Sequence, residues 1–224
     1  DQASTISKAQ QDLNKELHSD RSDFGNRDNA GGVAKRLPEA LVYMIKNNWC
    51  NSFLDYGCGK GGLVKRLLKY QELKQIVQGY DPAVDEFSQY PQKPVDILSC
   101  LDVLEHIELN TIDNVIDDIK RLTKNFCFVV VDLQPAVKHL SDGRNAHILL
   151  APKDWWVHKF NVRFASVLSF PLRHKSNHDQ KIVIIATNDS SFISPMITFA
   201  KILNIFGMKM TGGTLGKSKV PSKK

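Results

Sequence analysis

The 224-residue sequence lacks several features that would point to other classes of protein. None of its four cysteines lies in a Cys-x-x-Cys pair, which argues against a zinc ribbon and against a disulfide framework. It has no apolar run long enough to span a bilayer, and it does not open with a signal-peptide pattern. We therefore expect a cytoplasmic protein with buried free thiols, no transmembrane segment and no metal site.

Acidic residues are missing from the C-terminal end, where residues 209–224 contain five lysines. Without these lysines the formal net charge falls from +6 to +1, so the rest of the chain is nearly neutral. Proteins that bind nucleic acids usually carry their positive charge on the folded surface. We interpret this segment as a basic, flexible tail, with contact to nucleic acid or another anionic surface as the alternative.

Hydrophobic periodicity alternates between strand and helix along most of the chain. Apolar runs typical of strands alternate with stripes at helical spacing, which favours an α/β fold with a Rossmann-like, doubly wound, mainly parallel sheet. A turn-like HKSNHD segment separates the last two runs and predicts an antiparallel hairpin at one edge. The expected strands cover residues 52–56, 75–80, 95–101, 126–131, 165–172 and 181–187, and the expected helices cover about 1–19, 38–47, 63–68, 111–122, 152–160 and 192–206.

Composition divides the chain into four parts. Residues 1–32 predict a helix and a polar loop that could cover a binding site as a lid, and residues 33–188 predict the Rossmann-like domain. Residues 189–208 contain an apolar helix that is too short to span a bilayer. We expect it to pack on the body of the protein or on a second copy in a homodimer. Residues 209–224 are the basic tail.

A glycine-rich turn follows the first expected strand, in the segment Gly57-x-Gly59-x-x-Gly62. Closely spaced glycines between a strand and a helix let a ligand approach the backbone N–H groups. Asp81 follows about 20 residues later, where an acid can bind ribose hydroxyls. The pattern predicts a nucleoside-containing cofactor, either a nicotinamide dinucleotide or S-adenosylmethionine. A turn that serves only packing is the remaining alternative.

Asp55 distinguishes between these two cofactors. It lies two residues before the first glycine, at the carboxyl end of the strand. A carboxylate there would repel a diphosphate but attract the ammonium group of S-adenosylmethionine. Lys60, in the same turn, would favour a phosphate. On balance these residues favour the methyl donor, and a dehydrogenase stays as an alternative.

The order of three segments resembles the class I S-adenosylmethionine-dependent methyltransferases. FLDYGCGKG, GYDP and VDILSCLDVLEHIE are similar to motif I, the ribose-binding acid and motif IV of that family. The LHSD and FGNRDNAGG segments, YDPAV, SDGRNAH and the P-x-D-W-W segment resemble a bacterial and phage-type branch of it, over about residues 13–188. The resemblance implies a Rossmann-like methyltransferase. The predicted cofactor-binding residues are Asp55, Gly57, Cys58, Gly59, Gly61, Asp81 and Pro82, with Leu101, Asp102 and Val103 beside the methionyl and sulfonium part.

The sequence departs from the usual family pattern after the second strand. The stretch between Asp81 and Asp96 is too short for the usual helix and third strand. We therefore expect the sheet to lack one edge strand. The usual adenine-reading residues have no counterpart, and Ala83, Val84 or Phe87 could cover the adenine instead.

Two histidines are candidates for activating a methyl acceptor. His106 follows the third expected strand and His147 lies in the loop after the fourth, so both belong to the edge of the sheet where ligands bind. Each could serve as a general base or could instead anchor its own loop. Arg144, Asn145 and Trp155 are candidates for contacting the acceptor, although a tryptophan pair such as Trp155-Trp156 is more often part of a core.

The expected activity is methyl transfer to oxygen on a small molecule or glycan unit. A nucleic-acid methyltransferase is the first alternative, but the Asn/Asp-Pro-Pro-Tyr/Phe motif that holds a base amino group in many such enzymes is absent after residues 95–101. A non-catalytic module that binds S-adenosylmethionine is the second alternative.

Overall fold

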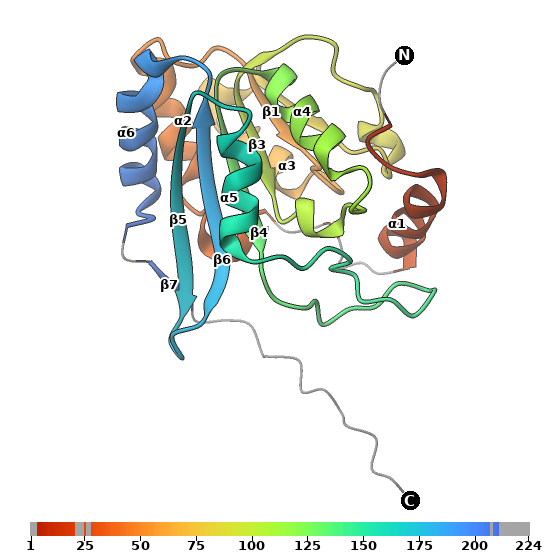
Figure 1. The fold of residues 1–224 in the computed structure, drawn as a ribbon. Coiled ribbons are helices and arrows are strands. Elements are labelled where there is room, and N and C mark those ends of the chain that lie inside the picture. Colours follow the sequence, from red (N-terminus) through yellow and green to blue (C-terminus); the bar gives the residue numbers. More distant parts are fainter. Residues whose placement is uncertain (1–3, 21–24, 26–27, 207, 211–224) are drawn as a thin grey trace, which may run out of the picture.

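The computed structural model describes residues 4–20, 25, 28–206 and 208–210, and it contains one sheet with helices on both faces (Figure 1). The α-helices are α1 (Lys8–Asp20), α2 (Leu37–Lys46), α3 (Gly62–Leu67), α4 (Ile112–Leu122), α5 (Lys153–Asn161) and α6 (Ile193–Leu203). The strands are β1 (Phe53–Tyr56), β2 (Val77–Tyr80), β3 (Val95–Leu101), β4 (Thr123–Asp132), β5 (Ser166–His174), β6 (Asp179–Thr187) and β7 (Lys209–Met210). Short 3-10 turns are η1 (Ala30–Gly32), η2 (Gln71–Leu73), η3 (Asp85–Phe87), η4 (Leu104–His106) and η5 (Ser190–Phe192).

The sheet has the strand order β2-β1-β3-β4-β6-β5-β7. Strands β1 to β4 run parallel to one another, and β6 pairs antiparallel with both β4 and β5. This arrangement confirms the predicted Rossmann-like fold with an antiparallel hairpin near one edge. The missing edge strand is also confirmed, because β2 is the outermost strand on its side and only η3 is assigned between β2 and β3.

Strand β4 shows why the sequence contains continuous apolar runs. Phe126, Phe128 and Val130 belong to the core on the face covered by α2 and α6. The alternate residues, which include Cys127 and Val129, belong to the core on the face covered by α4 and α5. Because successive side chains of a strand point to opposite faces, a strand buried on both sides is apolar at every position.

Helix α6 packs into the core of this chain. Its Phe199 ring packs edge-on against Phe126 and Phe128, at centroid distances of 5.2 and 5.5 Å. Packing on the body of the protein was one of the two expectations for this helix, and the structure places it there. Within the described residues, no helix is both long and apolar enough to cross a membrane.

The ends of the chain differ from the sequence prediction in two places. The N-terminal helix begins at Lys8 rather than at the first residue. Lys209 and Met210, which we assigned to the tail, pair parallel with β5 because the β5–β6 hairpin leaves an open edge that can accept another strand. The remaining parts of the predicted lid loop and tail, residues 21–24, 26–27 and 211–224, lie outside the described residues.

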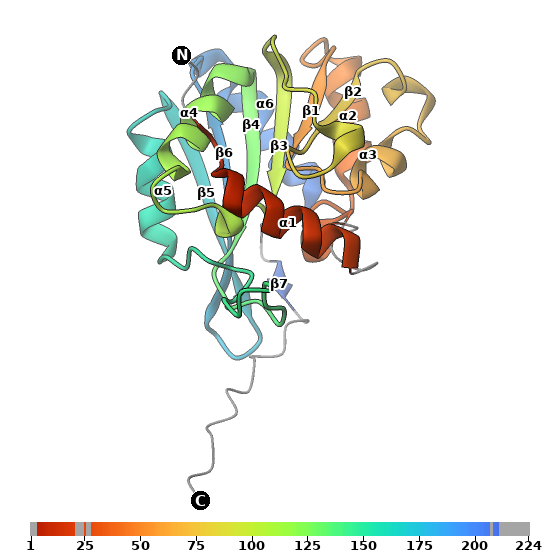
Figure 2. The ribbon, with the colours of Figure 1, turned by 90° about the vertical axis from the view of Figure 1, so that its right-hand side faces the viewer.

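Helix α1 lies apart from the two helical layers. Figure 2 shows it crossing in front of the lower part of the sheet. Gln11 donates a hydrogen bond to the Pro82 carbonyl just after β2, and Lys15 pairs with Asp85 of η3 at 2.7 Å. These contacts hold α1 beside the carboxyl end of β2, the end at which open α/β sheets bind ligands.

Candidate functional site

A cavity of about 320 Å³ lies at the carboxyl ends of β1, β2, β3 and β4. This volume is within the range of small-molecule sites. The cavity is lined by eleven of the predicted site residues: Asp55, Gly57, Cys58, Gly59, Asp81, Pro82, Leu101, Asp102, Val103, His106 and His147. The sequence therefore predicted most of the residues of one site, although they come from the ends of four separate strands.

The glycine turn between β1 and α3 depends on the absence of side chains. Gly57 has a φ of +77°, and a Cβ at this position would lie 2.5 Å from Cγ2 of Val103. The Gly57 N–H donates to the Tyr80 carbonyl at 2.7 Å, which ties the turn to the end of β2. Glycine is therefore required at position 57 both by the backbone conformation and by the close approach of Val103.

Asp55 supplies a buried carboxyl group at the end of β1. One of its oxygens accepts a hydrogen bond of 2.7 Å from the hydroxyl of Ser99 on β3. Burial raises the pKa of Asp55 to about 7, the Ser99 hydrogen bond lowers it, and the charge of Asp81 raises it further. Within the described residues no cation pairs with Asp55, so the group is suited to a ligand that brings its own positive charge.

Asp81 is held in a fixed orientation after β2. Its Oδ2 accepts from the Gly59 N–H and its Oδ1 accepts from the Ala83 N–H, both at 2.9 Å. A carboxylate oxygen can accept more than one hydrogen bond, so both oxygens can also receive hydroxyl groups from a ligand. Ala83, one of the three residues suggested for the adenine, lines the cavity as well, whereas Val84 and Phe87 are not among its lining residues.

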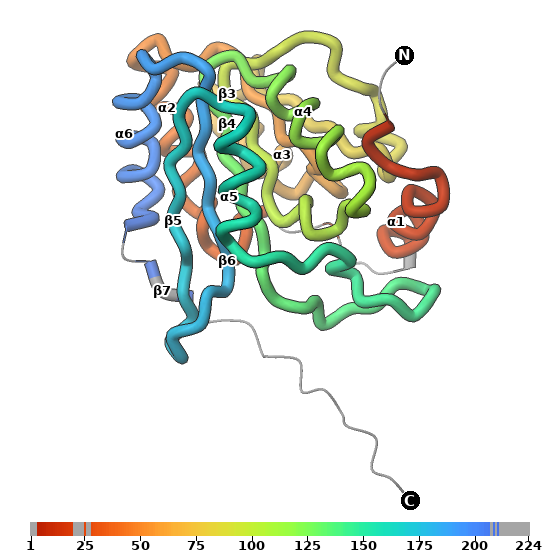
Figure 3. The backbone as a smooth tube through the Cα atoms, viewed as in Figure 1, coloured from red at the N-terminus to blue at the C-terminus, as the bar shows by residue number. Residues whose placement is uncertain are grey.

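Helix α1 bridges the two ends of the cavity. In Figure 3 the loop between β4 and α5 extends out to α1. Ser141 in this loop donates to Glu16 at 2.7 Å, and Arg144 donates to Gln10 at 3.1 Å. Asn14 and His18, also from α1, line the cavity. The helix therefore encloses the site between the β2 side and the β4 side.

The two predicted catalytic histidines lie together at the β4 end of the cavity. Their rings meet edge-on at a centroid distance of 4.8 Å. Nδ1 of His106 is 2.7 Å from the Ala146 carbonyl, and Nδ1 of His147 is 2.5 Å from the Gln134 carbonyl. Because a carbonyl only accepts, each Nδ1 carries the proton and each Nε2 carries the lone pair of the neutral ring. Burial lowers the pKa of His147, against the effect of its hydrogen bond to Gln134.

A buried charge network lies behind these histidines. Nζ of Lys181 on β6 is 2.5 Å from Oδ1 of Asp102 and 3.1 Å from Oδ2 of Asp132. Burial would lower the pKa of Lys181, but Asp102 and Asp132 raise it above its ordinary value. Burial and the charge of Asp102 raise the pKa of Glu105 well above its ordinary range, and Lys181 opposes them. One lysine therefore pairs with the carboxylates at the ends of both β3 and β4.

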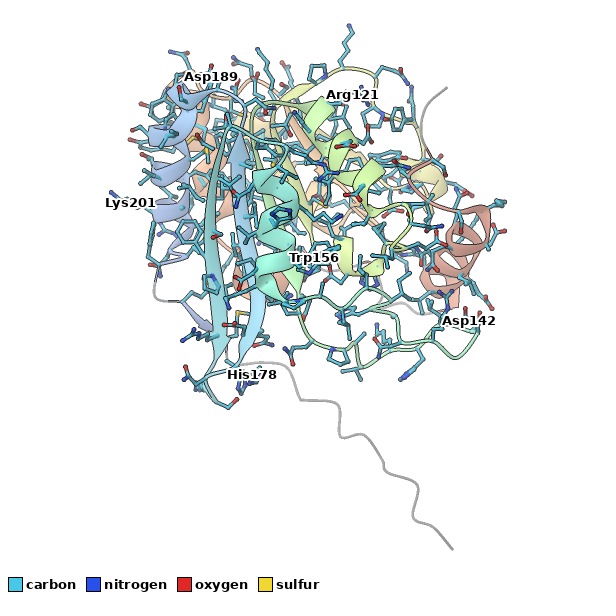
Figure 4. All side chains as sticks on the ribbon, in the orientation of Figure 1. Arg121, Asp142, Trp156, His178, Asp189 and Lys201 are labelled. Atoms are coloured by element: carbon cyan, nitrogen blue, oxygen red, sulfur yellow. The ribbon has the colours of Figure 1, made fainter. Side chains whose placement is uncertain are left out.

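Four predicted site residues do not line the cavity. Gly61 is the N-cap of α3, with a φ of +73°. Arg144 pairs with Asp142 at 2.7 Å, and Figure 4 places Asp142 at the outer end of the loop beside α1. Trp155 packs edge-on against Trp156 on α5, with Lys159 over its ring at 4.8 Å. Trp156 belongs to the core between α5 and the sheet, Trp155 packs against that core, and neither lines the cavity.

Asn145, the fourth of these residues, has a structural role. Its side-chain oxygen accepts from the N–H groups of Ala136 and His147, both at 2.9 Å, and its amide donates to the Ala136 carbonyl. It therefore holds the strand-like segment that carries His147. Asn145 was predicted to contact an acceptor. It does not line the cavity, and instead it positions His147, which does.

Sequence reasoning assigned no role to several polar residues that line the cavity or lie next to it, among them Glu105, Asp132, Gln134 and Lys181. Asp132 could have been found, because it directly follows the apolar run 126–131 and so lies at the carboxyl end of a strand. Lys181 gave a weaker signal as a lysine at the start of an otherwise apolar strand. The burial of Glu105 depends on the fold of the later loop and has no local signal.

Comparison with known proteins agrees with this geometry. Residues 10–165 match a protein-family profile described as a methyltransferase domain. No curated protein sequence matches the chain significantly.

Solved methyltransferase structures share the fold. A Burkholderia thailandensis 1,6-didemethyltoxoflavin-N1-methyltransferase, solved with 1,6-didemethyltoxoflavin and S-adenosylhomocysteine, superposes with a TM-score of 0.54 at 12% identity, over 78% of this chain and 85% of that one. The DhpI–S-adenosylhomocysteine complex superposes with a TM-score of 0.51 at 12% identity, over 82% of this chain and all of that one.

Proposed function

We propose that this chain methylates a hydroxyl oxygen of a small molecule or glycan unit. The chain belongs to the family of methyltransferase domains and is an S-adenosylmethionine-dependent methyltransferase. The proposal concerns the acceptor and the residues that act on it. Its main support is the pair of histidines, His106 and His147, which line the cavity with their rings in edge-on contact.

The cavity residues fit S-adenosylmethionine. Two buried carboxyl groups, Asp55 and Asp81, lie on neighbouring parallel strands and line the same cavity. A diphosphate would be repelled there, whereas an ammonium group is attracted by Asp55 and ribose hydroxyls can donate to Asp81.

We assign the residues around the cofactor accordingly. Asp55 binds the ammonium group, and Asp81 binds the ribose hydroxyls. Leu101 and Val103 lie beside the sulfonium, and Ala83 lies beside the adenine. The cofactor supplies an electrophilic methyl group on a positively charged sulfur, and the role of the chain is to align an acceptor with it and to exclude water.

An oxygen acceptor explains the histidines best. A hydroxyl is a weak nucleophile until its proton is withdrawn, whereas an amine or thiol needs less help. Nε2 of each histidine carries a lone pair because each Nδ1 donates to a carbonyl. Both rings line the cavity, so they can contact the reacting oxygen and draw off its proton.

A small acceptor suits the enclosure of the site. Helix α1 spans the cavity, with contacts to Pro82 on one side and to the loop of Ser141 on the other. We infer that α1 and its following loop act as a lid over the bound cofactor. Outside residues 209–224 the chain is nearly neutral, which is unlike a surface that binds a nucleic-acid backbone.

The test is formation of S-adenosylhomocysteine with acceptor pools of different chemistry. Pools of phenols, hydroxylated metabolites, sugar nucleotides, RNA and DNA are each supplied with S-adenosylmethionine, and the methylated atom is located by NMR. Methylation of oxygen in one of the small-molecule or sugar pools is expected, with a large loss in His147→Ala and no loss in His158→Ala, whose side chain is exposed on α5. Turnover only with nucleic acid, or methylation only of nitrogen, would refute the proposal. Binding of S-adenosylhomocysteine without turnover on any pool would indicate the non-catalytic module instead.

A further inference from the structure

We propose that Glu105, His106 and His147 together bind a divalent transition-metal ion, with Zn²⁺ as the ion that this ligand set favours. One carboxylate oxygen of Glu105 and one ring nitrogen of each histidine all lie within 4.8 Å of one another. Two atoms bonded to one ion at about 2.1 Å lie at most about 4.2 Å apart, so the three side chains would rotate toward one another when the ion binds.

The hydrogen bonds of the histidines orient them for this role. Histidines that bind metals usually donate their other ring N–H to a carbonyl or carboxylate, which fixes the tautomer and the ring orientation. Here Nδ1 of His106 donates to the Ala146 carbonyl and Nδ1 of His147 donates to the Gln134 carbonyl. In both rings Nε2 is left with the lone pair that a cation needs.

The buried carboxyl group of Glu105 is a second observation that points to a cation at this place. Its side chain is fully buried, and Oε1 accepts a hydrogen bond of 3.1 Å from the Asp132 N–H. Oε2 is buried with no hydrogen-bond partner among the described residues. A buried carboxylate oxygen without a partner is costly, and a cation at the neighbouring histidines would give it one.

The backbone keeps the three ligands together although they come from distant parts of the chain. Glu105 and His106 belong to η4, directly after β3, whereas His147 lies in the loop after β4. The Leu149 N–H donates to the Glu105 carbonyl at 3.0 Å, and His106 is bonded to the Ala146 carbonyl. The loop is therefore attached to η4 on both sides of His147.

The surrounding charges also favour a divalent cation. Three carboxyl groups, on Asp102, Glu105 and Asp132, lie in this region with one buried ammonium group, that of Lys181. Lys181 forms its ion pairs with Asp102 and Asp132. When ionised, the three carboxylates exceed the charge of the lysine by two, which a divalent ion would balance.

The nature of the ligands narrows the choice of metal. Mg²⁺ and Ca²⁺ prefer oxygen ligands, whereas imidazole nitrogen suits Zn²⁺ and other transition-metal ions. Three protein ligands leave a coordination position open to a molecule in the cavity. With an ion bound, the Nε2 lone pairs of both histidines are its ligands, so the cation would replace the histidines in activating the acceptor, by lowering the pKa of its bound hydroxyl. This catalytic role rests on the proposed oxygen acceptor, but metal binding itself does not.

Metal content tests the proposal without any acceptor. Tag-free protein is treated with a chelator, loaded with excess Zn²⁺ or Co²⁺, desalted and analysed by elemental mass spectrometry. We expect on the order of one ion per chain. We also expect visible Co²⁺ absorption of a site with nitrogen ligands. Glu105→Gln and His147→Ala should each lower Zn²⁺ affinity by more than about 100-fold, the upper range seen for changes outside the ligands themselves.

Matched controls make the outcome decisive. His158→Ala removes an exposed histidine of α5 and should retain the ion. Binding of S-adenosylhomocysteine by each variant shows that it is folded, and His147→Gln replaces His147→Ala if that variant fails this check. Wild-type protein that retains no ion, or ligand variants that retain as much as wild type, would overturn the metal site. If the ion binds but the methyl group goes to nitrogen, the metal site stands and the proposed acceptor fails.

Discussion

The ammonium group of Lys181 lies 2.5 Å from Oδ1 of Asp102, and both side chains are almost fully buried. Asp102 also has a φ of +55°, a conformation that costs energy for any residue other than glycine. The ion pair therefore fixes a strained residue at the end of β3, directly before η4. Through it, strand β6 contributes to a site otherwise built from the parallel strands.

Replacing Lys181 by Met should destabilise the protein by about 3–5 kcal/mol, because two buried carboxylates lose their counter-ion. Urea unfolding followed by circular dichroism measures this change. Lys8→Met is the control, since the Lys8–Asp12 pair is exposed and should contribute less than about 1 kcal/mol. Similar losses in the two variants would contradict the buried network.

Binding of S-adenosylhomocysteine should strengthen by about tenfold between pH 6 and pH 8, because Asp55 ionises near pH 7 and only its charged form attracts the ammonium group. Titration calorimetry measures the affinity at each pH. Asp55→Asn should bind more weakly at pH 8 and lose most of this pH dependence. The comparison variant is Asp117→Asn, whose exposed carboxylate pairs with Arg163.

The carboxyl group of Asp55 should make the ligand-free protein less stable at high pH, whereas it strengthens ligand binding there. The pKa of Asp55 is higher in the folded chain, so folding takes up a proton and stability falls as the pH rises from about 4 through about 7. Asp55→Asn should therefore raise the melting temperature at pH 8 and have little effect at pH 4. An equal shift at both pH values would show that the carboxyl group is not the cause.

Gly57→Ala should greatly reduce cofactor binding, because the new Cβ would lie 2.5 Å from Val103 on a backbone with positive φ. Gly143→Ala separates the two causes: Gly143 also has a positive φ, but a Cβ added there would have no neighbouring atom within 4 Å. Thermal-shift measurements with S-adenosylhomocysteine compare them. Adding Val103→Ala to Gly57→Ala should restore part of the stability. If it does not, the contact between the new Cβ and Val103 is not the cause of the loss.

Asn145→Ala should destabilise the protein by about 1–3 kcal/mol, since the N–H groups of Ala136 and His147 lose their acceptor. Hydrogen exchange of these two amides should become faster, while affinity for S-adenosylhomocysteine should change little. Asn114→Ala removes a single exposed hydrogen bond to Ser4 and serves as the reference. Unchanged exchange in Asn145→Ala would argue against its positioning role.

Much of the cofactor end of the site could be predicted from the sequence because its signals are local. Asp55 and Gly57 are adjacent to one strand end and Asp81 is at the next, and parallel strands bring such ends to one edge of a sheet. The acceptor end was predicted less well. His106 and His147 line the cavity, but Arg144 and Trp155 were chosen for their chemistry and instead make contacts outside it.

The sequence by itself determined the α/β class, the glycine turn and the shortened edge of the sheet, because periodicity, glycine spacing and chain length act over short distances. Only the tertiary structure decided that Glu105 meets His106 and His147 and that Lys181 forms ion pairs with both Asp102 and Asp132. These groups come from separate strands and a long loop. Their proximity depends on how the antiparallel β6 aligns with β4 and how the loop bonds to η4, and neither is determined by any one stretch of residues.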